Sequence, residues 1–591
     1  MSNLHNPCNK NKTNDNCSDK IFMIPCSQSS KLRIKQSWTS ISWLIAPLSL
    51  TSCNSDNKKI LGLAGNAASE GIEKLLQENP SVSTAYTISS NNPVSSTGDG
   101  STSLPIEVSG AVVASPVISG YPLLDFTFSA AGTVDFSNVS DAKNIVISNS
   151  KAGASLTNLS TDIEKIFVKD TQLGDWTMSF TPNSFGTLYL EWTNNSGASV
   201  DLTSLTLNET GQLALKNAGN EPITIPLLNL DPEDTQRIEI GNDNDGDIII
   251  SAASDITGTS ALKTISLTTW NDGDIILGTP GTAGLPNLKL LSSVALDASE
   301  TGIITLGDLG KTTPIDNLSS FAIGTKGSAV SIGSISAKKI TSIIASGTEF
   351  SSINFGTITI EEMISSFTLS GAGSITLGAF SGDGTVNLNA NNMTKKGISL
   401  DFSSLNGSVD IVATSQDDTI AMGVGSGKVV SGAGQDTISI VANATGNGDI
   451  RSGDGVDTIT LSSQKGIDII QPGGTKVSTI NGAAVNHIDI LADKIINFDP
   501  TSDKISFGSI TANTNNFKSE TGASSFSDAL SKANTAMSSG KVYYLSYNVA
   551  SATDGFGLIF YDNDSNGFSD ECITLVGITT DVITHDHLVI V

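Results

Sequence analysis

Cysteine is scarce in this chain and is concentrated at one end. Five cysteines occur in 591 residues, and four of them lie within the first 53. The rest of the chain contains only Cys572, so no disulfide framework holds the folded part together. Aromatic residues make up only 5% of the chain, whereas glycine alone contributes 56 residues. This composition favours thin β-coils over a bulky globular core.

Basic residues are also few. The chain has 32 lysines and arginines against 59 acidic residues, which gives a net charge of −27. Phosphate groups would be repelled, so neither nucleic acid nor an anionic membrane surface is expected as a partner. An acidic excess of this size fits a protein that binds divalent cations.

The residues that common hydrolases require are missing or out of place. The only histidines are His5, His487, His585 and His587. None stands in the His-Glu-x-x-His pattern of a zinc protease, and no Gly-x-Ser-x-Gly motif marks a lipase. We therefore expect no enzymatic activity. One alternative stays open, since acid pairs such as Asp243 and Asp245 could serve a polysaccharide lyase or hydrolase built on a β-helix.

Residues 1–53 have the pattern of an export leader. Basic residues precede the apolar run Ile41–Leu50, and small residues follow it. The run is too short to span a bilayer comfortably, and Pro47 interrupts it. Leu50–Cys53 resembles a bacterial lipobox, which implies lipidation of Cys53. A lipid anchor there is the only membrane contact that the sequence predicts.

Residues 54–104 divide into two parts. Residues 58–79 carry a helix-like spacing of leucines and isoleucines, including Leu61, Leu75 and Leu76. Residues 80–104 are rich in serine, threonine, asparagine and proline, which is typical of a linker.

Residues 105–410 contain degenerate β-repeats. Asn244–Ile250 recurs as Asn271–Leu277, and a later series of units closes on glycines at nearly even intervals. Those glycines are Gly307, Gly333, Gly356 and Gly378. Each unit comprises two short alternating strands and a turn, and it cannot bury its apolar face alone. Stacking into a β-solenoid is predicted; the alternative is a set of separate β-sandwiches.

Residues 411–490 repeat a Gly-x-Gly-x-Asp-x-apolar unit. The glycines let the backbone adopt conformations that a Cβ forbids, and turn carbonyls beside a carboxylate are ligands that suit Ca²⁺. The interval from Asp418 to Asp436 equals two nonapeptides, which is the length expected of one full coil. The interval from Asp436 to Asp457 is slightly longer, which predicts a small insertion at 444–447.

This pattern resembles the nonapeptide of the RTX family, which folds as a calcium-filled parallel β-roll. The resemblance covers residues 410–591 and implies one to three calcium sites. The residues that it assigns to calcium are Asp418, Gly432, Gly434, Asp436, Gly453, Gly455, Asp457 and Asp468. An ordinary Asp-Gly turn in a β-protein is the simpler alternative.

Residues 491–591 are expected to form a cap. Ala492–Phe507 resembles the segment that closes RTX rolls, and residues 525–540 have a helical pattern. The loop 562–571 places Asp562, Asp564, Asn566 and Asp570 at the spacing of a calcium loop, although Ile573 replaces the usual glutamate at position twelve. An acidic hairpin turn is the alternative interpretation of this loop.

The C-terminal residues 585–591 resemble the uncleaved signal of type I secretion. Such a signal conflicts with the lipobox, because a chain normally uses one export route. Both routes stay open at this point.

Together these features predict an all-β protein. It comprises an elongated parallel β-solenoid, a short RTX-like calcium β-roll and a small α+β or β cap. The function expected from the resemblance is that of a calcium-binding structural protein, extracellular or on the cell surface, which folds or assembles with Ca²⁺ as S-layer proteins do. The alternatives are a surface adhesin that binds a glycan and a polysaccharide-active enzyme. Its expected partners are calcium, further copies of itself in a lattice, or a surface glycan.

Overall fold

The chain divides into two units, Met1–Asn57 and Lys58–Val591. A computed structural model describes residues 77–81, 85–89, 95–110, 113–151, 153–169, 171, 174–180, 186–193, 200–230, 233–252, 261–281, 285–299, 301–441, 444–462, 466–473, 475–476, 492–507, 510–548, 555–578 and 581–590. The expected leader with Cys53, and the helix-like segment as far as residue 76, lie outside these residues.

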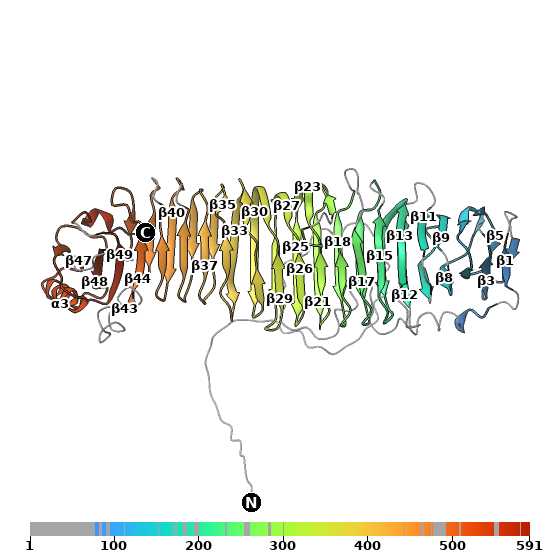
Figure 1. Cartoon of the computed structure of the whole chain (residues 1–591), viewed down its shortest axis with the longest axis horizontal. Coiled ribbons are helices and arrows are strands. Elements are labelled where there is room, and N and C mark those ends of the chain that lie inside the picture. Colours follow the sequence, from blue (N-terminus) through green and yellow to red (C-terminus); the bar gives the residue numbers. More distant parts are fainter. Residues whose placement is uncertain are drawn as a thin grey trace, which may run out of the picture. The chain divides into compact units, whose positions relative to one another are not determined.

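The described part of the second unit is an elongated parallel β-solenoid of about 17 turns. Successive coils place their strands side by side, and the wall of β-strands continues from β1 (Tyr86–Ile88) to the C-terminal cap (Figure 1). Almost all strand pairings are parallel and link each coil to the next, which confirms the predicted solenoid. Separate β-sandwiches, the alternative, would pair their strands antiparallel.

Two walls run along the solenoid. The first is a 25-stranded sheet, which wraps around the middle coils (residues 285–405) and there supplies two ladders of strands; the second comprises a 12-stranded sheet followed by a 10-stranded sheet. The first sheet contains β1, β3 (Ser103–Val108), β6 (Leu123–Phe128), β8 (Asn144–Ser148), β10 (Lys165–Lys169), β12 (Gly186–Thr193), β14 (Thr210–Asn217), β16 (Arg237–Asn242), β18 (Thr264–Thr269), β20 (Leu285–Asn287), β21 (Ser293–Ser299), β23 (Leu309–Thr313), β24 (Ile315–Leu318), β25 (Ser320–Lys326), β27 (Ile335–Ile340), β28 (Ile343–Gly347), β30 (Ile358–Gly371), β32 (Phe380–Gly382), β33 (Thr385–Met393), β35 (Ser404–Leu405), β36 (Val409–Val412), β38 (Gly427–Val430), β40 (Gly448–Gly453), β42 (Ile469–Pro472) and β45 (Lys504–Ile505).

The second wall begins with the 12-stranded sheet. Its strands are β4 (Val113–Ala114), β7 (Gly132–Asp135), β9 (Ala154–Leu159), β11 (Gly174–Phe180), β13 (Val200–Asn208), β15 (Ile223–Asn229), β17 (Ile248–Ala252), β19 (Ile275–Leu277), β22 (Ile304–Leu306), β26 (Ala329–Ile332), β29 (Ser352–Phe355) and β31 (Ser374–Thr376). Two further strands, β2 (Ser95–Thr97) and β5 (Val117–Ser119), form a small sheet of their own.

Along each strand, apolar side chains that point inward alternate with side chains that point outward, and the inward ones form the core. Ile265 pairs in register with Val294, and Val294 with Phe321, and all three side chains are fully buried between the walls. Burying a side chain of this size stabilises the fold by about 1.5–3 kcal/mol. Because each coil repeats the same inward positions, the apolar columns continue from coil to coil, as the repeats predict.

Aromatic rings extend one of these columns. The rings of Phe355 and Phe367 lie 5.7 Å apart, those of Phe367 and Phe380 6.2 Å, and those of Phe380 and Phe402 4.5 Å. Such ring pairs add about 0.5–1.5 kcal/mol each beyond the area that they bury. This stack carries the core from the long coils into the first coil of the roll.

The coils become shorter in the roll without a break in the wall. Strand β36 pairs with β33 on one side and β38 on the other. In the opposite wall, β37 (Thr419–Met422) pairs with β39 (Thr437–Ile440), and β39 with β41 (Thr458–Thr460). Thr419 and Thr437 are partners, so one coil here has the length of two nonapeptides, as the sequence predicts.

A mixed sheet and one helix close the solenoid. Strand β44 (Asp493–Ile496) pairs parallel with β49 (Glu571–Val576), which continues antiparallel into β48 (Phe556–Tyr561) and β47 (Tyr543–Asn548). The other strands of this sheet are β34 (Ser399–Asp401), β43 (Thr475–Lys476) and β46 (Phe517–Thr521). This switch in direction ends the coil-on-coil pairing that an open solenoid edge would invite.

The predicted helix of the cap is present as α3 (Phe526–Met537). The Ser525 side chain accepts the backbone N–H of Asp528 and caps its N-terminus. Ala529 and Ala533 are fully buried in one apolar cluster with Phe560 of β48. No helix among the described residues is long and apolar enough to cross a membrane.

Candidate metal centre

A ladder of buried aspartates runs along the turn that precedes the second wall of the roll. The backbone N–H of Asp418 donates to Oδ1 of Asp436 over 2.8 Å. The N–H of Asp436 donates to Oδ1 of Asp457 over 2.9 Å, and that of Asp457 to Oδ1 of Asp493 over 3.0 Å. The ladder therefore stacks one carboxylate on each coil, directly before strands β37, β39 and β41 and at the first residue of β44.

Two oxygens of this ladder make no direct hydrogen bond. Asp436 is 1% exposed and Asp457 is fully buried, yet Oδ2 of each makes no hydrogen bond. The hydroxyls of Ser431 and Ser452 lie near the carboxylates of Asp436 and Asp457 and lower their pKa values, but neither makes a direct hydrogen bond to Oδ2. An unpaired buried carboxylate oxygen is costly, because it has lost water without gaining another partner. These atoms therefore need a cation or a proton.

Burial, together with neighbouring negative charges, raises the pKa values of the ladder aspartates. Burial raises the pKa of Asp457 to about 7, and the charges of Asp493 and Asp454 add to the rise. Burial also raises the pKa of Asp436 to about 6, with Asp457 and Asp418 contributing. A bound divalent cation would favour the charged carboxylates and reverse both shifts.

Glycines allow the coils to approach closely beside the ladder. The four predicted glycines all have positive φ: Gly432 (111°), Gly434 (129°), Gly453 (81°) and Gly455 (146°). At Gly453 a Cβ would clash with the carbonyl oxygen of Gly432 on the preceding coil. The predicted need for glycine is therefore confirmed as a matter of backbone and packing, while binding through the glycine carbonyls stays a prediction.

Asp468 belongs to a different ladder, on the turn that precedes the first wall. Its Oδ1 accepts the N–H of Gly448 over 2.7 Å, and its own N–H donates to Oδ1 of Asp503 over 3.1 Å. The sequence grouped Asp468 with Asp418, Asp436 and Asp457, but it lies beside β42 and not beside their strands. Burial raises the pKa of Asp468 to about 6.

The loop of the cap brings its predicted carboxylates together. Single oxygens of Asp562, Asp564 and Asp570 all lie within 4.8 Å of one another. Gly567 has a φ of 87° at the sharp turn, as expected. Oδ1 of Asn566 accepts the N–H of Phe568 over 2.9 Å, and both oxygens of Asp562 accept backbone N–H groups of the loop. The loop thus satisfies its carboxylates internally, unlike the first ladder.

Two places offer oxygens to a cation such as Ca²⁺: the loop of the cap, which brings three carboxylates within 4.8 Å, and the first ladder, which holds buried oxygens without a hydrogen bond. The ladder's oxygens are hard ligands on adjacent coils, and the acidic surroundings favour a divalent cation. Asp493 and Asp503, which were not among the predicted site residues, each extend one ladder into the closing segment. Their signal is an Asp-Lys-Ile triplet, which repeats the Asp-x-Ile pattern of Asp457 and Asp468. In the first ladder, Asp436 and Asp457 offer the oxygens that would hold the ion, whereas both oxygens of Asp418 already accept backbone N–H groups, from Ile398 and Thr414.

The acid pair considered for an enzyme is split by the fold. Asp243 is 4% exposed and lies 2.6 Å from the Lys216 ammonium, whereas Asp245 is exposed. Asp243 is therefore held in a buried ion pair.

No protein-family model matches the chain, and no curated protein or solved structure is significantly similar to it.

Proposed function

We propose that this protein is an extracellular, calcium-stabilised β-solenoid with a structural role at the cell surface. The observation that supports calcium binding most directly is the ladder Asp418–Asp436–Asp457–Asp493, whose buried Oδ2 atoms at Asp436 and Asp457 make no direct hydrogen bond. Calcium bound between these coils would satisfy oxygens that the protein leaves without a direct hydrogen bond.

The acidic ladder also supports a location where calcium is plentiful. Without the ion, the folded chain stacks buried carboxylates with raised pKa values, so part of the folding free energy is missing. Because only the folded state has the site, calcium binding contributes to stability. Folding would then accompany export, and the rod would stiffen once it reaches the outside.

The experiment is a calcium titration of the purified full chain, followed by calorimetry and light scattering. A rise in the melting temperature with calcium, reversed by a chelator, supports the proposed stabilisation. Ordered assembly on calcium addition supports a surface-layer role like that of S-layer proteins, whereas a monomer that merely stiffens favours a single-molecule role. An unchanged melting temperature would refute calcium stabilisation.

A further inference from the structure

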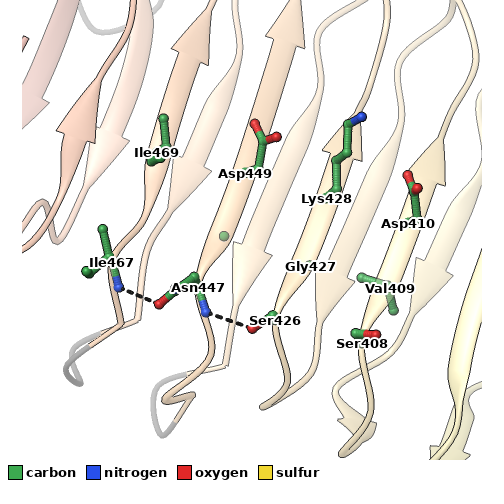
Figure 2. Close-up of a pocket in the computed structure, with 11 residues that line it drawn as sticks. Ser408, Val409, Asp410, Ser426, Gly427, Lys428, Asn447, Asp449, Ile467 and Ile469 are labelled. Carbon is green, nitrogen blue, oxygen red and sulfur yellow. Dashed lines mark hydrogen bonds between the residues drawn. The ribbon is translucent and has the colours of Figure 1, made fainter. Parts of the chain in front are cut away.

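An open groove of about 350 Å³ lies on the outer face of the roll, across strands β36, β38, β40 and β42 (Figure 2). Its two rims are rows of side chains that repeat from coil to coil, and its floor is backbone at Gly427 and Gly448. One rim contains Ser408, Ser426, Asn447 and Ile467, and the other contains Asp410, Lys428, Asp449 and Ile469. We call this feature the roll groove.

The charged rim of the roll groove alternates in sign. Lys428 is in strand register with Asp410 on one side and Asp449 on the other. Its ammonium nevertheless forms no ion pair with any described residue, and Figure 2 shows the three side chains in a row beside the groove. Elsewhere on the same sheet, the Lys338 ammonium lies 2.6 Å from Asp316.

Further polar groups of the rims also remain available. Asp449 is half-buried and its Oδ1, which is turned away from solvent, forms an ion pair of 3.6 Å with Arg451, so only its Oδ2 can serve a ligand. Asn447 uses its Oδ1 to accept the N–H of Ile467, which leaves its amide NH₂ without a partner among the described residues. On the charged rim, Lys428 lies between Asp410 and Asp449 at a spacing of about 4.8 Å per coil, and Asn447 offers its amide from the facing rim.

We propose that the roll groove binds a neutral, hydroxyl-rich polysaccharide chain that runs along the roll, across its strands. A sugar hydroxyl both donates and accepts, so a row of alternating amine and carboxylate groups satisfies it from one side. Ile467, which is 50% exposed, offers an apolar surface at one end for the C–H face of a sugar ring. The volume falls at the lower end of the range for small-molecule sites.

Other polymers fit the roll groove less well. A nucleic acid or a strongly anionic glycan would be repelled by Asp410, Asp449 and the net charge of −27. An extended peptide cannot add itself as a strand, because β38 and β40 are already paired on both edges.

The test is titration calorimetry of the full chain with cellohexaose, laminarihexaose and mannohexaose in calcium-containing buffer. Binding of at least one neutral hexasaccharide is expected. Lys428→Ala and Asp449→Asn should each weaken it about tenfold, because each removes a charge-assisted hydrogen bond. Lys338→Ala, on the same sheet but outside the groove, should leave the affinity unchanged. Matching melting curves establish that the three variants fold.

Absence of binding to all three sugars, or binding that both groove variants leave unchanged, would overturn the proposal. So would light scattering that shows self-association of the wild type, abolished by Lys428→Ala, without sugar binding. Repeating the titration in chelator separates this inference from the proposed function. If the chain binds sugar but calcium does not change its stability, the proposed calcium role is refuted and the proposed sugar site is supported.

Discussion

The backbone N–H of Asp436 donates a 2.9 Å hydrogen bond to Oδ1 of Asp457 on the next coil, and Oδ2 of both residues is buried without a direct hydrogen bond. Each aspartate thus positions its neighbour while keeping one oxygen unsatisfied. The hydrogen bond fixes the register of the coils, and the unsatisfied oxygens make the stack dependent on whatever neutralises them. The same side chains therefore fix the register of the coils and make their stability depend on a cation.

Asp457→Asn should abolish most of the stabilisation that calcium gives. The amide can still accept the N–H of Asp436, but it brings no negative charge to the ion. At a calcium concentration of one hundred times Kd, the loss should approach about 2.7 kcal/mol. Thermal unfolding with and without calcium measures it.

The same substitution should raise stability slightly in chelator at neutral pH, because it removes a buried charge. Asp454→Asn is the matched control, since Asp454 lies in the same turn but is exposed. If Asp454→Asn removed the calcium effect as fully as Asp457→Asn does, the ladder would not be the principal site.

In the absence of calcium, stability should fall as the pH rises from about 4 to about 7. The folded-state pKa values of Asp436 (about 6) and Asp457 (about 7) lie above their unfolded value of 3.8. Between these values the folded state binds more protons than the unfolded state, so raising the pH destabilises it. Denaturant unfolding in chelator across this range measures the slope.

Calcium should flatten or reverse that slope, because deprotonated carboxylates bind the ion and protonated ones do not. Carboxylates with lowered pKa values, such as Asp308, act below 3.8 and so do not mask the effect. A chelated chain that gains stability from pH 5 to pH 7 would show that the ladder is not protonated in the calcium-free fold.

Repeats made most of the fold predictable. Units closing on Gly307 and Gly333 could bury their apolar faces only by stacking, and in the structure the N–H of Gly333 bonds to the carbonyl of Leu306 on the preceding coil. The interval of two nonapeptides from Asp418 to Asp436 likewise predicted the length of one coil of the roll. These patterns recur along the sequence because every coil must bury its apolar face against its neighbours in the same way.

Sequence could not separate the two ladders or extend them. Asp468 follows Asp457 after only part of a coil, so it occupies the opposite turn, whereas the next member of the first ladder is Asp493, much farther along the chain. Because the coils differ in length, the aspartates of one ladder are not evenly spaced in the sequence. The roll groove could not be predicted from the sequence either, because Asp410, Lys428 and Asp449 become neighbours only through strand register.

Gly453→Ala should destabilise the roll more than Gly522→Ala destabilises the cap. Both glycines have similar positive φ, 81° and 88°, so alanine suffers about 1–2 kcal/mol of backbone strain at either position. A Cβ at Gly453 also clashes with Gly432, whereas nothing lies within 4 Å of one at Gly522. The clash should add about 1–3 kcal/mol.

Denaturant unfolding of the two variants, each against wild type, measures this difference. Equal losses in the two variants would mean that strain alone requires glycine at 453, and that the coils can move apart to admit a methyl group.

Phe380→Ala tests whether the aromatic stack couples the long coils to the roll. Phe380 is fully buried between Phe367 and Phe402, so its removal leaves a cavity and should cost about 3–5 kcal/mol locally. In a solenoid each coil contacts only its neighbours, so the loss of hydrogen-exchange protection should be greatest in β30, β32 and β35 and fade along the rod in both directions. Phe350→Ala is the control, because Phe350 is 85% exposed and its removal should change stability by less than about 0.5 kcal/mol. Uniform loss of protection across every coil would instead mean that the whole rod unfolds as one cooperative unit, and that the junction at Phe380 is no weaker than the rest.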